Sequence, residues 1–420
     1  MIMKVYIQMV IMIIHSKITP NIEQMRDWRR QIHQYPELGF EEFATSQLVA
    51  ELLKDWGYEV HARIAGTGVV GVLRWGEEPG LSLGLRADMD ALPIKEATGL
   101  PWASQVAGKM HACGHDGHTA ILLGVAETIA RLHRTKQLPR SGTLHLIFQP
   151  AEEMGFNGGA ERMIEDGLFE RFPCDGLFAL HNFPGIPTGK LCFREGAFMA
   201  SSDTAKLTFT GKGGHAALPH LAQDPTLPAA ATLLALQSIV GRNVDPNQMA
   251  LISVGRIQAG TSANVIPNTA ELELSIRTLA PEVRDALERR IHTLAQSQAE
   301  AFGCQCEVEY DRGYPVLKND PEMTRLAIDT ARKLFGDDCV DASIQPLTGS
   351  EDCAYLLERV PGCYFLVGNG DNGHNAGVRT GPCCVHNPHY DFNDDCMPAA
   401  ANFLVGLVSR YFSESPHAEA

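Results

Sequence analysis

The sequence predicts an α/β domain that is interrupted by a second, ferredoxin-like (α+β) domain. Three observations support this prediction. At 420 residues the chain exceeds the size at which a single core usually divides. Apolar runs rich in β-branched residues alternate with helical periodicity in the first and last parts. Between them the order becomes β-α-β-β-α-β, the split unit of a ferredoxin-like sandwich. We therefore expect one domain built from residues 16–199 and 313–415, and the other from residues 200–312.

The composition indicates a globular protein with small-molecule chemistry. A formal net charge of -15 disfavours binding to nucleic acid or to an anionic membrane surface. Eleven cysteines at irregular spacing form no closed disulfide framework, which favours a reducing, cytoplasmic location. The apolar first 15 residues lack a small-residue cleavage site and are too short to span a bilayer. We expect them to form a disordered or strand-like extension.

The first domain is expected to begin with helical segments between residues 21 and 56. Met25, Trp28 and Ile32 recur at helical spacing, and Gly57 ends the second helix. Further helices are expected at 119–132 and 320–335, and strands at 69–73, 81–85, 143–148, 176–180 and 363–368. The run 66–71 matches the dinucleotide pattern G-x-G-x-x-G, but it opens a β-branched strand where the pattern requires a helix. We therefore reject a nucleotide site there.

The second domain is expected to follow the ferredoxin-like order. Its strands are predicted at 205–209, 249–254, 270–278 and 306–310, and its helices at 224–240 and 281–302. The first strand alternates apolar and polar residues, which is typical of a strand with one face exposed. This alternation distinguishes the second domain from the continuous apolar strands of the first.

The stretch 111–118, HACGHDGH, is the most unusual in the chain. Thiolate and imidazole are ligands that suit zinc and related metals. Gly114 and Gly117 would allow the tight bend that brings Cys113 and His115 onto one ion. The alternative is a helix N-terminus with solvated or capped histidines. We favour a metal site on condition that distant residues complete the coordination sphere.

Polar residues follow the apolar strands at the points where these end. Asp88, Glu152, Glu153 and His181 all occupy such positions, and ligands of open α/β sheets bind at the carboxyl ends of strands. We therefore expect these residues to converge with the segment 111–118. Two adjacent carboxylates repel each other unless a cation is near, although a solvated acidic loop is the alternative. We predict that Glu153 binds a metal and that Glu152 acts as general base and then as general acid.

Further candidates lie near the C-terminus and in the second domain. His386 is predicted as the remaining metal ligand, ahead of His389. His215 lies in a glycine-rich loop, and Asn264 and Arg277 are suitable anchors for a substrate carboxylate. Taken singly, each of these residues would more often be an ordinary surface residue.

Competing mechanisms lack their motifs. The sequence contains no H-E-x-x-H, no G-x-S-x-G and no Walker loop, which disfavours zincins, serine hydrolases and nucleotide hydrolases. Two rivals from other classes stay open. One is a metal-storing or ligand-binding protein without catalysis, and the other is a thiol redox protein that uses Cys113.

Together these motifs resemble the hippurate hydrolase and N-acyl-amino-acid amidohydrolase family, which belongs to the dinuclear metallo-aminoacylases and carboxypeptidases. The resemblance extends in order from about residue 27 to residue 394. It rests on RADMDALP (86–93), HACGHDGHT (111–119), FQPAEE (148–153), ALHN (179–182), GKGGHAALPH (211–220), ANVIPNTAELELSIRT (263–278), GSED (349–352) and VHNPHYDFND (385–394).

The resemblance implies a metallopeptidase-like catalytic domain with a mixed sheet and a smaller lid that also forms a homodimer. It implies two divalent metal ions per subunit, zinc or manganese with cobalt or nickel as alternatives, held by Cys113, His115, Glu153, His181 and His386. Glu152 would be the base. His215 would help to stabilise the oxyanion in the partner's site, while Asn264 and Arg277 would hold the substrate. Many relatives have H-x-D at residues 86–88, so Asp88 is expected to act only as a support for the ligands.

The implied reaction is hydrolysis of the amide bond in a small N-acyl amino acid. Hippurate-like, N-acetyl and aryl-acyl amino acids are the expected substrates. The nearest alternative is a dipeptidase or carboxypeptidase that uses the same dinuclear site, because the bond cleaved is chemically equivalent.

Overall fold

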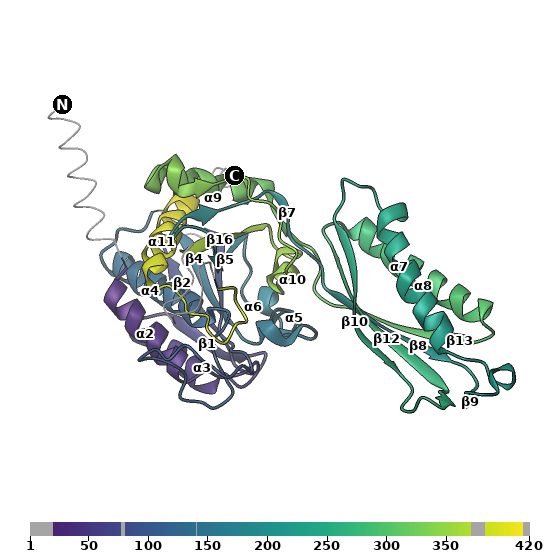
Figure 1. Ribbon diagram of the computed structural model, residues 1–420. Helices are drawn as coiled ribbons and strands as arrows, with labels where there is room; N and C mark the ends of the chain where they lie inside the picture. Colours follow the sequence, from purple (N-terminus) through teal and green to yellow (C-terminus); the bar gives the residue numbers. More distant parts are fainter. Residues whose placement is uncertain (1–19, 77–79, 140, 371–382, 415–420) are drawn as a thin grey trace. The chain divides into compact units, whose positions relative to one another are not determined.

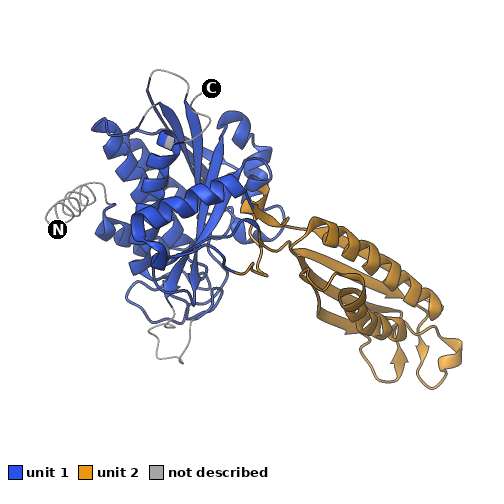
Figure 2. Cartoon of the chain, turned by 90° about the horizontal axis from the view of Figure 1, so that it is seen from above, with its two compact units in different colours: residues 1–196, 319–344, 356–420 blue, residues 197–318, 345–355 orange. Residues whose placement is uncertain are grey.

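The computed structural model describes residues 20–76, 80–139, 141–370 and 383–414 (Figure 1). They form two compact units, shown in blue and orange in Figure 2. Unit 1 comprises residues 1–196, 319–344 and 356–420, and unit 2 comprises residues 197–318 and 345–355. The predicted fold class is confirmed. The expected extension at residues 1–15 lies outside the described part of the chain.

A mixed sheet forms the centre of unit 1. In the part of the chain that the structure describes, its strands follow the order β1-β2-β4-β3-β5-β16-β6-β15. The central strands β4, β3, β5 and β16 run parallel to one another, so their carboxyl ends meet at one edge. β1 and β2 add an antiparallel flank. The strands are β1 (Glu59–Ile64), β2 (Gly68–Trp75), β3 (Leu81–Asp88), β4 (Gly142–Gln149), β5 (Gly176–Pro184), β6 (Leu191–Cys192), β15 (Val340–Asp341) and β16 (Gly362–Gly370).

Helix α4 is the central helix of unit 1. It is buried along most of its length, as expected of a helix that packs within a core. It contacts β3, β4 and β5, and α2, α3 and α11 pack against it. The helices of this unit are α2 (Ile22–Gln34), α3 (Phe43–Trp56), α4 (His115–Arg134), α5 (Gly159–Glu165), α6 (Leu168–Arg171), α9 (Pro321–Phe335) and α11 (Met397–Glu414). Short elements also occur close to the limits of the two units, namely β7 (Gly196–Met199), β14 (Leu317–Asn319) and α10 (Cys353–Leu357).

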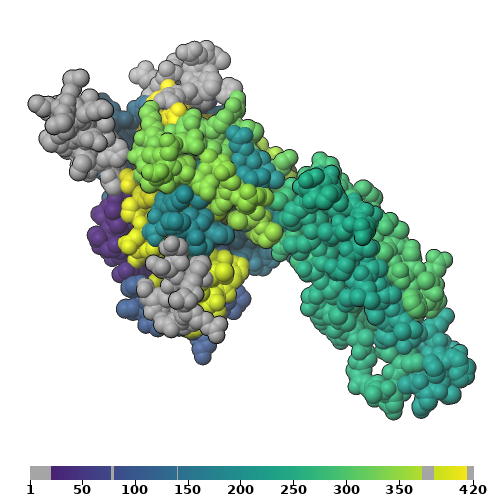
Figure 3. All heavy atoms as spheres, turned by 45° about the horizontal axis from the view of Figure 1, so that its top comes forward, coloured from purple at the N-terminus to yellow at the C-terminus, as the bar shows by residue number. Residues whose placement is uncertain are grey.

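Helices from opposite ends of the chain meet in unit 1. α2 and α11 are in contact, and their atoms lie side by side in purple and yellow in Figure 3. Local signals set the limits of the first helices: Asn21 caps α2 by accepting from the Gln24 amide at 3.2 Å, and Gly57 ends α3 in the left-handed region with φ 95°. Among the described residues, none of the helices combines the length and apolar character that a bilayer crossing requires.

Unit 2 has the predicted β-α-β-β-α-β order. Its described strands follow the spatial order β10-β12-β8-β13, all antiparallel, which is the ferredoxin-like arrangement. Alternate residues of β8 and β12, such as Leu207 and Leu272, are buried against α7 and α8. The elements are β8 (Asp203–Thr210), β9 (Gly214–His215), α7 (Thr226–Asn243), β10 (Ala250–Ala259), β11 (Val265–Ile266), β12 (Thr269–Thr278), α8 (Pro281–Ala301) and β13 (Gln305–Arg312).

Candidate metal centre

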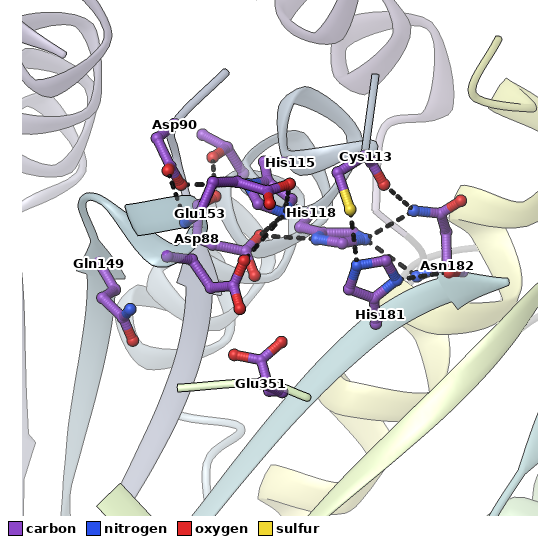
Figure 4. A network of polar contacts seen from close by, with 12 residues as sticks. Asp88, Asp90, Cys113, His115, His118, Gln149, Glu153, His181, Asn182 and Glu351 are labelled. Atoms are coloured by element: carbon purple, nitrogen blue, oxygen red, sulfur yellow. Dashed lines mark hydrogen bonds and ion pairs between the residues drawn. The ribbon is translucent and has the colours of Figure 1, made fainter. Parts of the chain in front are cut away.

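The candidate site lies in unit 1, beyond the carboxyl ends of its parallel strands (Figure 4). Cys113 and His115 stand at the start of α4, where the helix begins four residues earlier than predicted. Glu152 and Glu153 form a single 3₁₀ turn that follows β4, and His181 lies on β5. The strand β3 continues through Asp88 and therefore ends later than predicted.

Side-chain atoms of the five predicted ligands come together. The potential ligand atoms of Cys113, His115 and His181 lie within 4.8 Å of one another, and so do those of Cys113, Glu153 and His386. Cys113 belongs to both groups. The Glu152 carboxylate forms another such group with His115 and Glu153, which places the predicted base beside the predicted ligands.

The turn that carries Cys113 requires glycine at position 114. Gly114 has φ 99°, and a Cβ atom there would lie 2.3 Å from Asn182 Nδ2 and 2.7 Å from Tyr390 Oη. Asn182 Nδ2 donates to the carbonyl of Cys113 at 2.7 Å, and the Tyr390 hydroxyl donates to Asn182 Oδ1 at 2.5 Å. Asn182 thus holds the backbone of Cys113, and Tyr390 in turn holds the side chain of Asn182.

The hydrogen bonds of His181 leave its Nε2 atom available for a metal. Its Nδ1 atom lies 2.5 Å from the carbonyl oxygen of Asn182, and a carbonyl can only accept, so Nδ1 carries the proton. The lone pair of Nε2 then faces Cys113 Sγ at 3.2 Å. Burial lowers the pKa of His181 well below its ordinary value, which favours the neutral imidazole that binds metals.

His115 is oriented in the same way by Asp90. Its Nδ1 atom lies 3.1 Å from Asp90 Oδ1, while Asp90 Oδ2 accepts from the Glu153 amide at 2.9 Å. Nε2 of His115 is buried and has no hydrogen-bond partner within the described ranges, and carboxylate oxygens of Asp88, Glu152 and Glu153 lie 3.9 to 4.0 Å from it. An unpaired imidazole nitrogen amid carboxylates fits a divalent cation.

The electrostatics of the buried groups also fit a cation. Burial lowers the pKa of His115, but the carboxylates of Asp88, Asp90 and Glu153 outweigh burial and raise this pKa to about 10. Burial raises the pKa of Cys113 well above its ordinary value, and the charges of Glu153 and Glu152 raise it further. A metal ion would reverse the effect on the thiol, since a coordinating thiol is deprotonated.

His118 supports the site and is not free to act as a ligand. Its Nδ1 atom lies 2.6 Å from Asp88 Oδ1, and its Nε2 atom accepts from the Asn182 amide at 2.9 Å. Arg86 donates to the other Asp88 oxygen at 2.7 Å. Burial would raise the pKa of Asp88, but the charges of His115 and Arg86 and the hydrogen bond with His118 hold it well below its ordinary value. Asp88 thus has the contacts expected of a support.

His386 approaches from the C-terminal segment. Its Nε2 atom lies 3.1 Å from Glu153 Oε1, and its side chain is 50% exposed, in contrast to the buried Cys113 and His115. Its amide donates to the carbonyl of Ala112 at 2.7 Å. The backbone of His386 has φ 65°, which is uncommon for a residue with a side chain and indicates that surrounding contacts hold it.

The turn that carries the two glutamates is anchored by Glu42. Ala151 precedes the turn with φ 51°, and its amide donates to Glu42 Oε1 at 2.8 Å. The Thr67 hydroxyl donates to Glu42 Oε2 at 2.5 Å. Burial raises the pKa of Glu42 to about 7. The supporting roles of Glu42, Asp90 and His118 were not predicted. Two of these residues had local signals, because His118 lies three residues after His115 on the same helix and Asp90 lies just past the carboxyl end of β3.

The remaining predicted site residues belong to unit 2. His215 lies in β9 and pairs with Val265 of β11. Asn264 is exposed and accepts from the Ser262 hydroxyl at 2.6 Å. Arg277 is half-buried on β12 and donates to Ser350 Oγ at 2.8 Å. The substrate-binding and oxyanion roles of these residues stay predictions.

Comparisons with known proteins find relatives that match most of the chain. The model of peptidase family M20/M25/M40 matches residues 84–410. A hippurate hydrolase of Campylobacter jejuni is 41% identical over 91% of the chain and 95% of its own length. An N-acetyl-L-cysteine deacetylase of Bacillus subtilis is 39% identical over 92% of the chain and 88% of its own length. A crystal structure of a dinuclear metal-binding M20 peptidase from B. subtilis superposes with a TM-score of 0.80 at 30% identity and covers 94% of this chain and 99% of that one.

Proposed function

Because the chain belongs to peptidase family M20/M25/M40, we propose that it is a metal-dependent amidohydrolase that cleaves N-acyl amino acids into a carboxylic acid and a free amino acid. The observation that carries this proposal is the convergence of Cys113, His115, Glu153, His181 and His386 beside the carboxylate of Glu152. A ligand set with an adjacent carboxylate is the arrangement that metal-assisted amide hydrolysis requires.

Two divalent ions fit the two overlapping ligand groups. When bound, they would polarise the scissile carbonyl and make water a stronger nucleophile at neutral pH. The thiolate of Cys113 and the imidazoles favour zinc, whereas the carboxylate of Glu153 also suits manganese, and cobalt or nickel can satisfy the same donors.

Glu152 would move the proton in this reaction. Its carboxylate lies 4.0 Å from His115 Nε2 and is largely buried, so it can accept a proton from the attacking water within the site. It would then deliver this proton to the nitrogen of the departing amine. Asp90 and Asn182 would hold His115 and Cys113 in place during both steps.

Unit 2 would supply substrate binding and dimerisation. We assign residues 200–312 to a lid, in which Asn264 and Arg277 bind the substrate carboxylate and His215 stabilises the oxyanion in the partner's site. Two observations support this assignment. β10 is an edge strand of the described sheet with an exposed Ile257, and an edge strand is a template for pairing with another chain. The guanidinium of Arg277 keeps donors beyond its bond to Ser350.

We also place the protein in the cytoplasm. All eleven cysteines are unpaired, including Cys383 and Cys384, which are adjacent in the sequence. Unpaired thiols in this number are typical of a reducing compartment.

A substrate panel tests the proposed function. Protein purified without added metal is analysed for its ions, then stripped with a chelator and reloaded with zinc or manganese. Each form is assayed with benzoylglycine, N-acetyl amino acids and dipeptides. We expect turnover of the N-acyl amino acids only in the loaded forms. Dipeptides that turn over far faster would instead support the dipeptidase or carboxypeptidase alternative, and equal turnover by the stripped protein would contradict the metal dependence.

A further inference from the structure

Arg29 of α2 connects two distant segments that carry proposed ligands. Its side chain is fully buried. Nε donates to Asp116 Oδ2 at 2.8 Å, and Nη2 donates to Asp391 Oδ1 at 2.9 Å. A third carboxylate oxygen, Asp394 Oδ1, lies 3.5 Å from Nη1. Asp116 directly follows the ligand His115 on α4, whereas the other two aspartates follow His386 in the C-terminal segment.

The C-terminal segment also packs directly on the start of α4. Phe392 is buried, and a Cβ atom on Gly117 would lie 2.3 Å from its ring, so only glycine permits this approach. The guanidinium of Arg29 lies 5.7 Å from the centre of the same ring. The segment is therefore held by an aromatic contact and by a guanidinium that reaches it from a third element.

Arginine suits this position because of its geometry. The planar fork directs separate N–H groups at separate carboxylates, whereas a lysine ammonium is a single point charge. Burial lowers the pKa of Arg29, but Asp116, Asp391 and Asp394 outweigh burial and raise this pKa above its ordinary value. The guanidinium is therefore charged, and without it the carboxylates would repel one another across the contact between α4 and the C-terminal segment.

We propose that Arg29 is a positioning residue that sets the place of His386 relative to the start of α4, and so tunes the metal position formed by Cys113, Glu153 and His386. This inference rests on the proposed metal site. The metal position formed by Cys113, His115 and His181 depends less on Arg29, because the core and Asn182 fix α4 and β5.

Asp391→Asn tests the proposal with little change in shape. It removes the carboxylate charge that faces Arg29 from the C-terminal segment and leaves all five proposed ligands intact. Asp395→Asn is the matched control, because the Asp395 side chain is 79% exposed and lies 4.0 Å from Arg26. Zinc affinity and stoichiometry are measured by competition with a chromophoric chelator. We expect Asp391→Asn to weaken the binding of one of the two zinc ions by about 10- to 100-fold, and we expect the control to leave the binding of both unchanged.

A double-mutant cycle separates positioning from general destabilisation. If Asp391 and Arg29 act through His386, then Asp391→Asn should cost no further zinc affinity in a His386→Ala background. Additive losses of zinc affinity, or equal weakening of the binding of both ions, would overturn the positioning role. So would wild-type affinities in both Asp391→Asn and Arg29→Lys. Wild-type protein that binds no zinc or manganese would overturn the proposed function itself, and this outcome is distinct from the other three.

Discussion

Both units bury ion pairs, but the two networks differ in the group at their centre. In unit 2, Arg284 donates to Asp203 and to the carbonyl of Gly313, and the Tyr310 hydroxyl also donates to Asp203. Nε and Nη2 of Arg284 and the hydroxyl of Tyr310 thus all meet acceptors, and we call this network closed. In unit 1, Nε2 of His115 is surrounded by carboxylates yet has no hydrogen-bond partner among the described residues. We call this second network open, because an imidazole nitrogen amid carboxylates fits a divalent cation.

The largest effect is expected on catalysis, from a substitution of Glu152 beside the open network. Glu152→Gln keeps the shape of the side chain but removes the proton acceptor, so we expect kcat to fall by about 10²- to 10⁴-fold while both metal ions stay bound. Steady-state kinetics and metal analysis measure the two quantities. Glu165→Gln on the exposed face of α5 is the matched control and should retain wild-type turnover. Unchanged turnover in Glu152→Gln would remove Glu152 from the role of base.

Breaking the closed network should lower the free energy of unfolding and leave metal binding unchanged. Asp203→Asn leaves the buried guanidinium of Arg284 without its anionic partner, which typically costs about 3–5 kcal/mol. Urea unfolding measures this loss, and metal analysis should still find the wild-type content. A drop in metal content would show that the two networks are coupled and would break the comparison.

A smaller effect is expected at Glu42, which borders the open network. Its pKa is about 7 in the folded chain against 4.5 for the free side chain, so native protein retains its proton up to a higher pH. Stability from this group is therefore fully present below pH 4.5 and is lost as the pH rises through 7. Glu42→Gln should remove this loss, worth about 3 kcal/mol at most.

Urea unfolding of chelator-treated protein at about pH 5 and about pH 8 measures this contribution. The free energies of unfolding of wild type and Glu42→Gln should diverge only at the higher pH. Equal pH dependence in wild type and Glu42→Gln would show that Glu42 is already ionised in the folded chain.

The smallest effect is expected at the exposed face of unit 2. Lys206 pairs with Glu271 across neighbouring strands at 3.1 Å, and both side chains are partly exposed. Lys206→Gln should change the free energy of unfolding by less than about 1 kcal/mol, because solvent screens such pairs. A loss as large as that of Asp203→Asn would contradict the distinction between buried and exposed pairs.

The sequence predicted the elements that have strong local signals. The four main strands and the two helices of unit 2 were found within a few residues, because alternation and helical periodicity are visible in a single segment. The two-residue strands β9 and β11 were not predicted. The strand β1 (Glu59–Ile64) was missed, since most of its residues are partly or fully exposed on both faces and show no alternation. Helix α11 and the short strands β6 and β15 were also not predicted.

The candidate site was predicted in part from residue chemistry and in part from resemblance. The family identified from the motifs is confirmed. Residue chemistry and position in the chain favoured a converging set that includes Cys113, His115, Glu153, His181 and His386. The assignment of all five as ligands of two metal ions came from the resemblance. Among the supporting residues Asp88 was expected, whereas the role of His118 was not predicted, because it depends on Asp88 and Asn182, which lie 30 and 64 residues away in the sequence.

The distance in sequence between Arg29 and its partners has a consequence for protein synthesis. Asp391 lies 362 residues after Arg29, and all of unit 2 is translated between them. While the ribosome is still producing unit 2, the emerging chain already contains Cys113, His115, Glu153 and His181, but neither His386 nor the carboxylates that follow it. A nascent chain at that stage therefore carries an incomplete set of the predicted metal ligands, and the partners of Arg29 on the C-terminal segment are not yet made.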